Sequence, residues 1–165
     1  MEPGSADTVE WLSVLDLWIS RQYLNPHMSR SDIKGSYRDL VAKATKMDLS
    51  QRDVTDIDKT LEWIFAYLDQ GKILAFVRHS PFGVIQINRH IARRLRPVLD
   101  RNPRDSVFAG MPIMITENDH VHELYNGDVG VVLRGRSGVY RAVFPRLGTF
   151  ISLPLSELTG YETAF

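Results

Sequence analysis

The sequence predicts an α/β protein in which helices and one buried strand precede a small antiparallel β-barrel. Three observations lead to this fold class. Apolar residues recur at helical spacing before residue 71, a continuous apolar run of strand length follows, and only short strand-like segments occur after residue 106. With 165 residues, 44% of them hydrophobic, the chain is long enough to bury a sizeable core.

Two segments near the start of the chain have apolar residues on one face at helical spacing. Residues 8–20 have Asp7 or Thr8 available as N-cap, and residues 31–46 are weakened by Gly35. The side chains expected to face the core are Trp11, Leu15 and Trp18 in the first helix and Tyr37, Leu40, Val41 and Ala44 in the second.

Residues 56–70 carry the clearest helical pattern of the chain. Thr55 or Asp56 is the expected cap, and Gly71 lies where glycine commonly follows a helix. The apolar face is expected to consist of Ile57, Leu61, Ile64, Phe65 and Leu68.

The run Lys72–Val77 predicts a strand buried on both faces, as in a parallel sheet. Arg78 follows it directly, at the end of the strand where α/β sheets bind ligands. After a turn at residues 80–83, residues 84–96 predict a helix that Pro97 ends. Its expected core residues are Val84, Ile87, Ile91 and Leu95.

Residues 101–105 are interpreted as a linker, so we expect a helical and α/β part at 1–105 and a small β-barrel at 106–165. The connections after residue 106 are too short for parallel crossovers, which predicts antiparallel hairpins in a barrel of the SH3 or OB kind. The expected strands are residues 112–117, 128–134, 139–144 and 149–153.

Charge is distributed unevenly along the chain, although the net charge is zero. Residues 1–72 carry a net charge of −3 and residues 73–165 one of +3, and every basic residue of the second part is arginine. Arginine suits bidentate phosphate contacts, which favours a nucleic-acid or nucleotide partner. A genome rich in G and C would also enrich arginine. No apolar run is long enough to span a membrane, and the absence of cysteine excludes disulfides and thiolate metal sites.

Two hairpin segments invite a functional interpretation. Asp119, His120, His122 and Glu123 are metal-ligand types, but the preceding turn keeps them from converging, so we expect a solvated connector and no metal. The string Asn126–Gly130 predicts a tight turn with a positive φ, in which Gly127 turns the chain and Gly130 permits a close approach. A stable hairpin and a partner-binding loop both fit it.

Motifs for independent catalysis are absent from the sequence. There is no Gly-rich phosphate loop ending in Lys-Ser/Thr, no dinucleotide-binding fingerprint and no nucleophile elbow. The helix at 84–96 and the linker hold six arginines, which could form either a phosphate-binding patch or a solvated face. Arg78 could likewise contact a ligand or pair with an acid.

Three stretches together resemble the RecD family, the alpha subunit of exodeoxyribonuclease V and a superfamily 1 DNA helicase. They are GKILAFVRHSPFGVIQIN, GMPIMITENDHVHELYNGDVGVVL and LPLSELTGYETAF, within residues 60–165. The family patterns are "LR-x-GPFG…LN", "GRPVMITRNDY-x-LGLFNGDIGI" and "ETAFAMTVHKSQG". The matching positions are Arg78, Pro81–Gly83, Asn88, Gly110–Pro112, Ile115–Thr116, Asn118–Asp119, Asn126–Gly130 and Glu162–Phe165.

The resemblance implies a piece of the second RecA-like motor domain with an inserted SH3-like β-barrel. It implies that the parent protein binds ATP and Mg²⁺, moves 5′ to 3′ on single-stranded DNA, and works with RecB- and RecC-like subunits in double-strand break repair and recombination. The absence of cysteine fits a cytoplasmic location. Arg78 would be the arginine of motif IV that contacts the γ-phosphate. Pro81, Gly83, Gly127 and Gly130 would shape turns. The expected DNA contacts are Arg89, Arg93, Asn118, Asp119, Asn126, Arg134 and Arg141.

The sequence departs from the family at Glu117, where arginine is usual, and at residues 120–123. We therefore expect an excised or truncated piece of a longer helicase, inactive and without cofactors by itself. The alternative is a non-catalytic SH3-like module that binds protein partners, although such a module has no need of Arg78 at the end of a strand.

Overall fold

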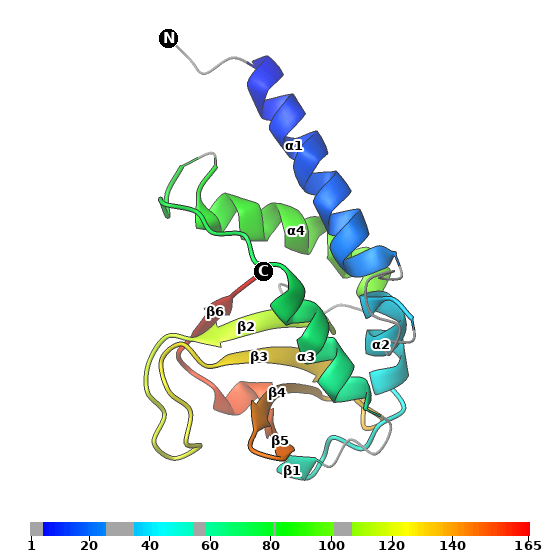
Figure 1. Ribbon diagram of the computed structural model, residues 1–165. Coiled ribbons are helices and arrows are strands. Elements are labelled where there is room, and N and C mark those ends of the chain that lie inside the picture. The colour runs from blue at the N-terminus through cyan, green and yellow to red at the C-terminus, as the bar shows by residue number, and fades with distance from the viewer. Residues whose placement is uncertain (1–4, 26–34, 55–58, 81, 101–106) are drawn as a thin grey trace.

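The computed structural model describes residues 5–25, 35–54, 59–80, 82–100 and 107–165, in which helices cover an antiparallel sheet (Figure 1). The helices are α1 (Ser5–Ile19), α2 (Tyr37–Ala44), α3 (Thr60–Gln70) and α4 (Val84–Leu99), with a π-helical turn (Ser20–Leu24) after α1 and a 3₁₀ turn (Leu155–Glu157) before the last strand. The strands are β1 (Asp53–Val54), β2 (Met111–Ile115), β3 (Val129–Arg134), β4 (Tyr140–Arg146), β5 (Thr149–Pro154) and β6 (Tyr161–Thr163).

The sheet has the order β1-β5-β4-β3-β2-β6, and every neighbouring pair is antiparallel. The four strands predicted after residue 106 are therefore confirmed. The expected closed barrel is not, because the edge strands β1 and β6 do not pair with each other. These edges are only two and three residues long, too short to close the sheet.

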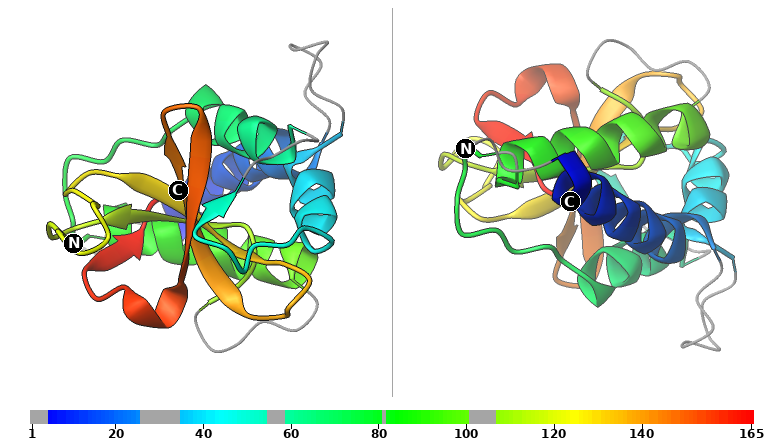
Figure 2. Two further views of the ribbon diagram at one scale, coloured as in Figure 1. Left: turned by 90° about the horizontal axis from the view of Figure 1, so that it is seen from below. Right: turned by 90° about the horizontal axis from the view of Figure 1, so that it is seen from above.

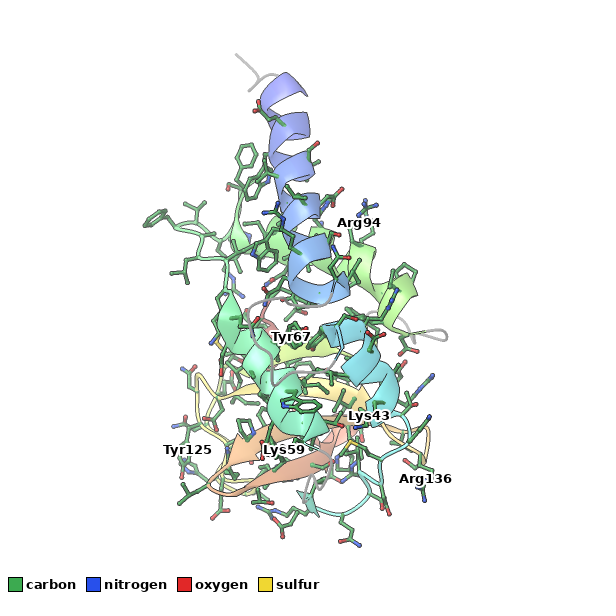
Figure 3. All side chains as sticks on the ribbon, turned by 45° about the vertical axis from the view of Figure 1, so that its right-hand side comes forward. Lys43, Lys59, Tyr67, Arg94, Tyr125 and Arg136 are labelled. Atoms are coloured by element: carbon green, nitrogen blue, oxygen red, sulfur yellow. The ribbon has the colours of Figure 1, made fainter. Side chains whose placement is uncertain are left out.

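The helices are arranged around the sheet in different ways. In Figure 1, α1 projects away from the sheet and meets α4 near its base, whereas α2 and α3 lie nearer to the strands. Figure 2 shows the molecule from below and from above, with α3 and α4 at opposite sides in both views. Arg94 of α4, labelled in Figure 3, forms an ion pair with Asp16 of α1 at 3.1 Å.

The helix starts differ from those predicted. Helix α1 begins at Ser5, so Asp7 and Thr8 lie inside it rather than before it. Helix α2 begins at Tyr37, after Gly35 with a φ of 102°. Ser36 caps α2 in a capping box, in which its hydroxyl accepts from the Asp39 N–H and Asp39 accepts from the Ser36 N–H.

The expected caps Thr55 and Asp56, the core residue Ile57, the turn residue Pro81 and the linker 101–105 fall outside the described residues. Gly71 follows α3 as predicted, with an extended backbone. The last turn of α3 is capped by Gln22, whose amide donates to the Tyr67 carbonyl at 2.6 Å.

The predicted buried strand at 72–77 is wrong. This segment is irregular, and Leu74 and Phe76 are fully solvent-exposed, at 91% and 107%. The apolar pattern is that of a buried strand, but within the described residues no strand pairs with it. A strand of this kind acquires burial only from neighbours on both sides.

Helix α4 runs past Pro97, which does not end it. The helix continues to Leu99, and the Asp100 N–H donates to the Arg96 carbonyl. Proline costs a helix the hydrogen bond of its own nitrogen, and near a C-terminus this loss leaves the later bonds in place.

One core of buried side chains joins the helices to the sheet. Tyr37 is completely buried, and its hydroxyl donates to the Gly110 carbonyl ahead of β2 at 2.9 Å. Tyr23 packs edge-on against Tyr37 and Phe165, at centroid distances of 5.2 and 5.9 Å. Burial raises the pKa of both Tyr23 and Tyr37, so these hydroxyls stay protonated. β1 belongs to this unit too, because it pairs with β5.

Candidate functional site

The segment that carries Arg78 is fixed to the start of α4 by its backbone. The Val84 N–H donates to the Val77 carbonyl at 3.0 Å, and the Ile85 N–H to the Arg78 carbonyl at 3.5 Å. These carbonyls occupy amide donors that the first turn of a helix leaves unused.

Gly83 allows this close approach. A Cβ at position 83 would lie 2.7 Å from the Arg78 carbonyl oxygen and 2.9 Å from the Ser80 nitrogen, both backbone atoms that cannot turn aside. The turn predicted at Gly83 is therefore a place where two backbone segments meet.

The side chain of Arg78 forms an ion pair with Glu162 of β6. Its Nη2 lies 2.6 Å from Glu162 Oε2, and the two residues are 84 positions apart in the sequence. The Arg78 side chain is 59% exposed and that of Glu162 28%. The pair therefore lies at the surface, at the junction of α4 and β6.

Asn88 of α4 holds the segment that carries Glu162. Its amide nitrogen donates to the Thr163 carbonyl at 2.7 Å, and its amide oxygen accepts from the Phe165 N–H at 3.2 Å. Two such bonds to alternate backbone groups imitate a neighbouring strand. We call Arg78, Gly83, Asn88, Glu162 and Thr163 the α4–β6 junction.

A cavity of about 620 Å³ opens between α1, residues 78–80 and α4, and we call it the cationic cavity. None of the described residues that line it is acidic. Its lining contains three arginines and two histidines, namely Arg78, His79, Arg89, His90 and Arg93. Trp11, Leu12 and Leu15 of α1 form an apolar wall. Such a cavity favours an anionic ligand with an apolar part.

A second hollow, a groove of about 520 Å³, lies between α4 and the strands β2 and β6. Arg89 and Arg93 line both the groove and the cationic cavity, whereas Glu162 lines the groove alone. The carboxylate of Glu162 therefore approaches Arg78 from outside the cationic cavity.

The β2–β3 loop holds Asn118, Asp119 and Asn126, three of the predicted DNA contacts. Asn118 accepts from the Asn126 N–H at 2.9 Å and so closes the loop. Asp119 accepts from the His122 imidazole at 2.7 Å and from the backbone N–H groups of His122 and Val121. The imidazole bond, followed by that from the His122 N–H, lowers the pKa of Asp119.

The other ring nitrogen of His122 lies 3.5 Å from Glu157. Across the described part of the chain, no three His, Asp or Glu side chains converge closely enough to hold a metal ion. Asp119 and His122 instead bind each other, while Glu123 pairs with Arg52 and His120 packs edge-on against Tyr125.

The turn at the end of the loop has the predicted geometry. Gly127 has a φ of 96°, and its N–H donates to the Ile115 carbonyl. A Cβ at Gly130 would lie 2.5 Å from the Phe144 ring on β4, so this glycine permits the predicted close approach.

Arg134 and Arg141, the remaining predicted DNA contacts, lie within the sheet and have partners there. Arg134 forms an ion pair with the buried Asp100 at 3.2 Å, and Arg141 donates to both the hydroxyl and the carbonyl of Ser152. Arg134 is at the opposite end of β3 from the β2–β3 loop, as the positions of Tyr125 and Arg136 illustrate (Figure 3).

The structure therefore brings Arg78, Arg89 and Arg93 together around one cavity and separates them from the other predicted contacts. No role was expected for Glu162 or Asn88 from the sequence. Both stand in stretches that resemble RecD, but only the fold shows that these stretches meet.

No model of a protein family matches the chain. Among curated proteins, it is similar to several that are named RecBCD enzyme subunit RecD. That of Mycobacterium tuberculosis (strain H37Rv) is 35% identical over 98 residues, which are 59% of this chain and 17% of that protein. That of Mycolicibacterium smegmatis is 39% identical over 98 residues, with the same coverage, and that of Haemophilus influenzae is 45% identical over 75 residues, 44% of this chain and 12% of that protein.

The match thus covers less than a fifth of these relatives' length. Within the described residues, no helix has both the length and the apolar character that crossing a membrane demands.

Proposed function

We propose that this chain, which sequence similarity supports as a RecD-family fragment, is part of the motor of an ATP-dependent DNA helicase subunit. The parent protein would bind ATP and Mg²⁺ and couple hydrolysis to 5′-to-3′ movement on single-stranded DNA. It would act with RecB- and RecC-like subunits in double-strand break repair and recombination, in the cytoplasm.

The observation that carries this proposal is the position of Arg78 at the rim of the cationic cavity. Phosphoryl transfer is catalysed mainly by placing positive charge near the transferred phosphate, and an arginine contributes when it is held in a fixed position. Arg78 has a fixed backbone and an ion-paired side chain, and Arg89 and Arg93 add positive charge to the same cavity.

The architecture proposed for the parent is a RecA-like motor domain, to which residues 1–105 belong, with an SH3-like insertion at 106–165. The exposed apolar segment 72–77 supports the first part, because Leu74 and Phe76 would become buried in a larger parallel sheet. The short, strongly paired strands β2 to β5 support the second.

The test is Arg78→Ala in the full-length parent. We expect turnover of ATP to fall by about three orders of magnitude, since an arginine that stabilises the transferred phosphate is worth about 10³-fold or more. DNA binding should be retained. ATP turnover is measured as DNA-stimulated phosphate release, and DNA binding as the affinity for single-stranded DNA.

Arg38→Ala is the matched control, because Arg38 is an exposed arginine on α2 that pairs with the neighbouring Asp39 at 3.8 Å. Its turnover should equal that of the wild type. Wild-type turnover in Arg78→Ala would refute the role of Arg78 in hydrolysis.

A second candidate function is a protein-binding module that performs no catalysis. It is favoured by apolar side chains exposed on the β2–β3 loop and the β4–β5 turn, where Val121 is 80%, Tyr125 53% and Leu147 103% exposed. Arg146 joins these two loops by donating to the Glu123 carbonyl at 2.7 Å. Exposed apolar patches of this kind mark protein contacts.

A salt titration of single-stranded DNA binding by the 165-residue chain separates the two functions. A helicase fragment should bind at low salt and lose affinity steeply as salt rises, because bound phosphates release counterions. A binding module should show no DNA affinity even at low salt, and that result would favour the second function.

A further inference from the structure

We propose that Glu162 is a positioning residue, which holds the guanidinium of Arg78 at the rim of the cationic cavity for phosphate contact. This inference rests on the proposed function and deepens it, because it names the group that places the arginine. Glu162 would touch neither phosphate nor substrate and would act through Arg78.

The contact leaves most of the guanidinium available. Arginine has five N–H donors, and Glu162 engages Arg78 through Nη2. Glu162 lines the groove and not the cationic cavity, so its carboxylate approaches from the side away from the anion. The remaining donors are free of Glu162, and Arg78 lines the cavity in which an anion would lie.

Both partners of the ion pair have independent anchors. The backbone of Arg78 is bonded to the first turn of α4, and Gly83 sets how closely the two segments approach. Glu162 lies on β6 opposite Met114 of β2, and Asn88 bonds the residue that follows it. The ion pair joins two anchored backbones and so restricts the torsions of the Arg78 and Glu162 side chains.

The exposure of the pair indicates placement rather than stability as its role. An ion pair whose arginine is 59% exposed is screened by solvent and contributes little to stability. Misplacing a catalytic group by about 1 Å, however, can lower a rate by roughly 100-fold. Loss of Glu162 should therefore affect turnover without unfolding the protein.

The test is Glu162→Gln in the full-length parent, with kcat and KM for ATP measured at saturating single-stranded DNA. We expect kcat to fall by roughly 10- to 100-fold while KM changes by about twofold or less, the pattern of an interaction realised in the transition state. Glu62→Gln is the control, because Glu62 is an exposed glutamate on α3 with the same change of charge.

A double-mutant cycle distinguishes positioning from a general structural effect. The double variant Arg78→Ala/Glu162→Gln should have the turnover of Arg78→Ala alone, since Glu162 has nothing to position once the arginine is gone. If Glu162→Gln lowered turnover by the same factor in both backgrounds, Glu162 would not act through Arg78, and the proposal would fall.

Two other kinetic outcomes would also overturn it. Wild-type kcat in Glu162→Gln would show that the carboxylate does not place Arg78, and a raised kcat would show that it competes with phosphate. Wild-type turnover in Arg78→Ala is a different result, which refutes the proposed role of Arg78 itself.

A measurement on the 165-residue chain tests the ion pair without reference to ATP. The ¹⁵N heteronuclear NOE of the Arg78 Nε–H group should be high in the wild type and fall in Glu162→Gln, while backbone amide spectra of the two remain alike. An unchanged NOE would mean that Glu162 does not order the guanidinium.

Discussion

At the scale of single residues, the backbone at Gly127 has a conformation that glycine adopts without strain and most other residues do not. Its φ is 96°, and no heavy atom lies within 4 Å of the place a Cβ would take. Any effect of a side chain here therefore comes from the backbone conformation and not from a clash.

Gly127→Val should lower the free energy of unfolding by about 1–2 kcal/mol, because a β-branched residue adopts positive φ only at that cost. In thermal unfolding this corresponds to a melting temperature lower by roughly 2–8 °C. Gly127→Asn, which tolerates positive φ better, should lose less. Equal melting temperatures for wild type and valine variant would contradict the strain.

This turn could be predicted because its chemistry is local. Asn126 and Gly127 specify a tight turn whatever the rest of the chain does. The ion pair between Arg78 and Glu162 could not be predicted, because it depends on the register of β6 and on the position of α4 beside it. Glu162 is visible in the sequence as an acid near the end of the chain, but the residues around it do not indicate which basic side chain it pairs with.

At the scale of elements, the β2–β3 loop is a folded unit organised around one carboxylate. Asp119 accepts from His122 through the ring and the backbone, and these bonds lower its pKa below the ordinary value of 3.8. A lowered pKa means that the folded loop favours the carboxylate form of Asp119 over the protonated form more than the unfolded chain does. Its stabilising effect is present above pH 3.8 and is lost as pH falls through the folded-state value.

The loop should therefore open in acid. The amide chemical shifts of Val121 and His122 should move together as pH falls below about 3.8, the ordinary pKa of Asp119. In Asp119→Asn these shifts should already be altered at neutral pH and show no such step. A step of wild-type size in the asparagine variant would assign it to another group.

Secondary structure was predictable wherever an element satisfies itself or finds a neighbour nearby in sequence. The helices and the strands β2 to β5 follow from periodicity and short connections. The start of α2 was not predicted: a helix was expected from residue 31, whereas the capping box of Ser36 and Asp39 starts it at Tyr37. The apolar run at 72–77 has the composition of a strand, but pairing needs a partner that composition does not provide.

At the scale of the whole molecule, the α/β class was predicted correctly, and the open sheet was not. Closure depends on whether the two edge strands meet, which no local pattern encodes. The addition of β1 to the far edge was missed because two residues are too few for a strand signal.

The helices and the sheet are also joined by a buried carboxylate that sequence patterns do not indicate. Asp100, at the end of α4, accepts from the Ala109 N–H and the Tyr140 hydroxyl and pairs with Arg134. A buried charge persists only with such partners, so these contacts bind α4 and β4 into one body. The position of α4, and with it the α4–β6 junction, is thereby tied to the sheet.

The pairing of β1 with β5 has a consequence for the order in which this protein can assemble. Asp53 lies opposite Ile151, so this edge of the sheet forms only when two segments far apart in the sequence come together. Contacts so distant in sequence require a large loop to close, which slows folding. During synthesis, α2 and α3 emerge long before the strands on which they pack, with apolar faces still exposed. Until those strands follow, the exposed apolar faces of α2 and α3 can associate with other chains.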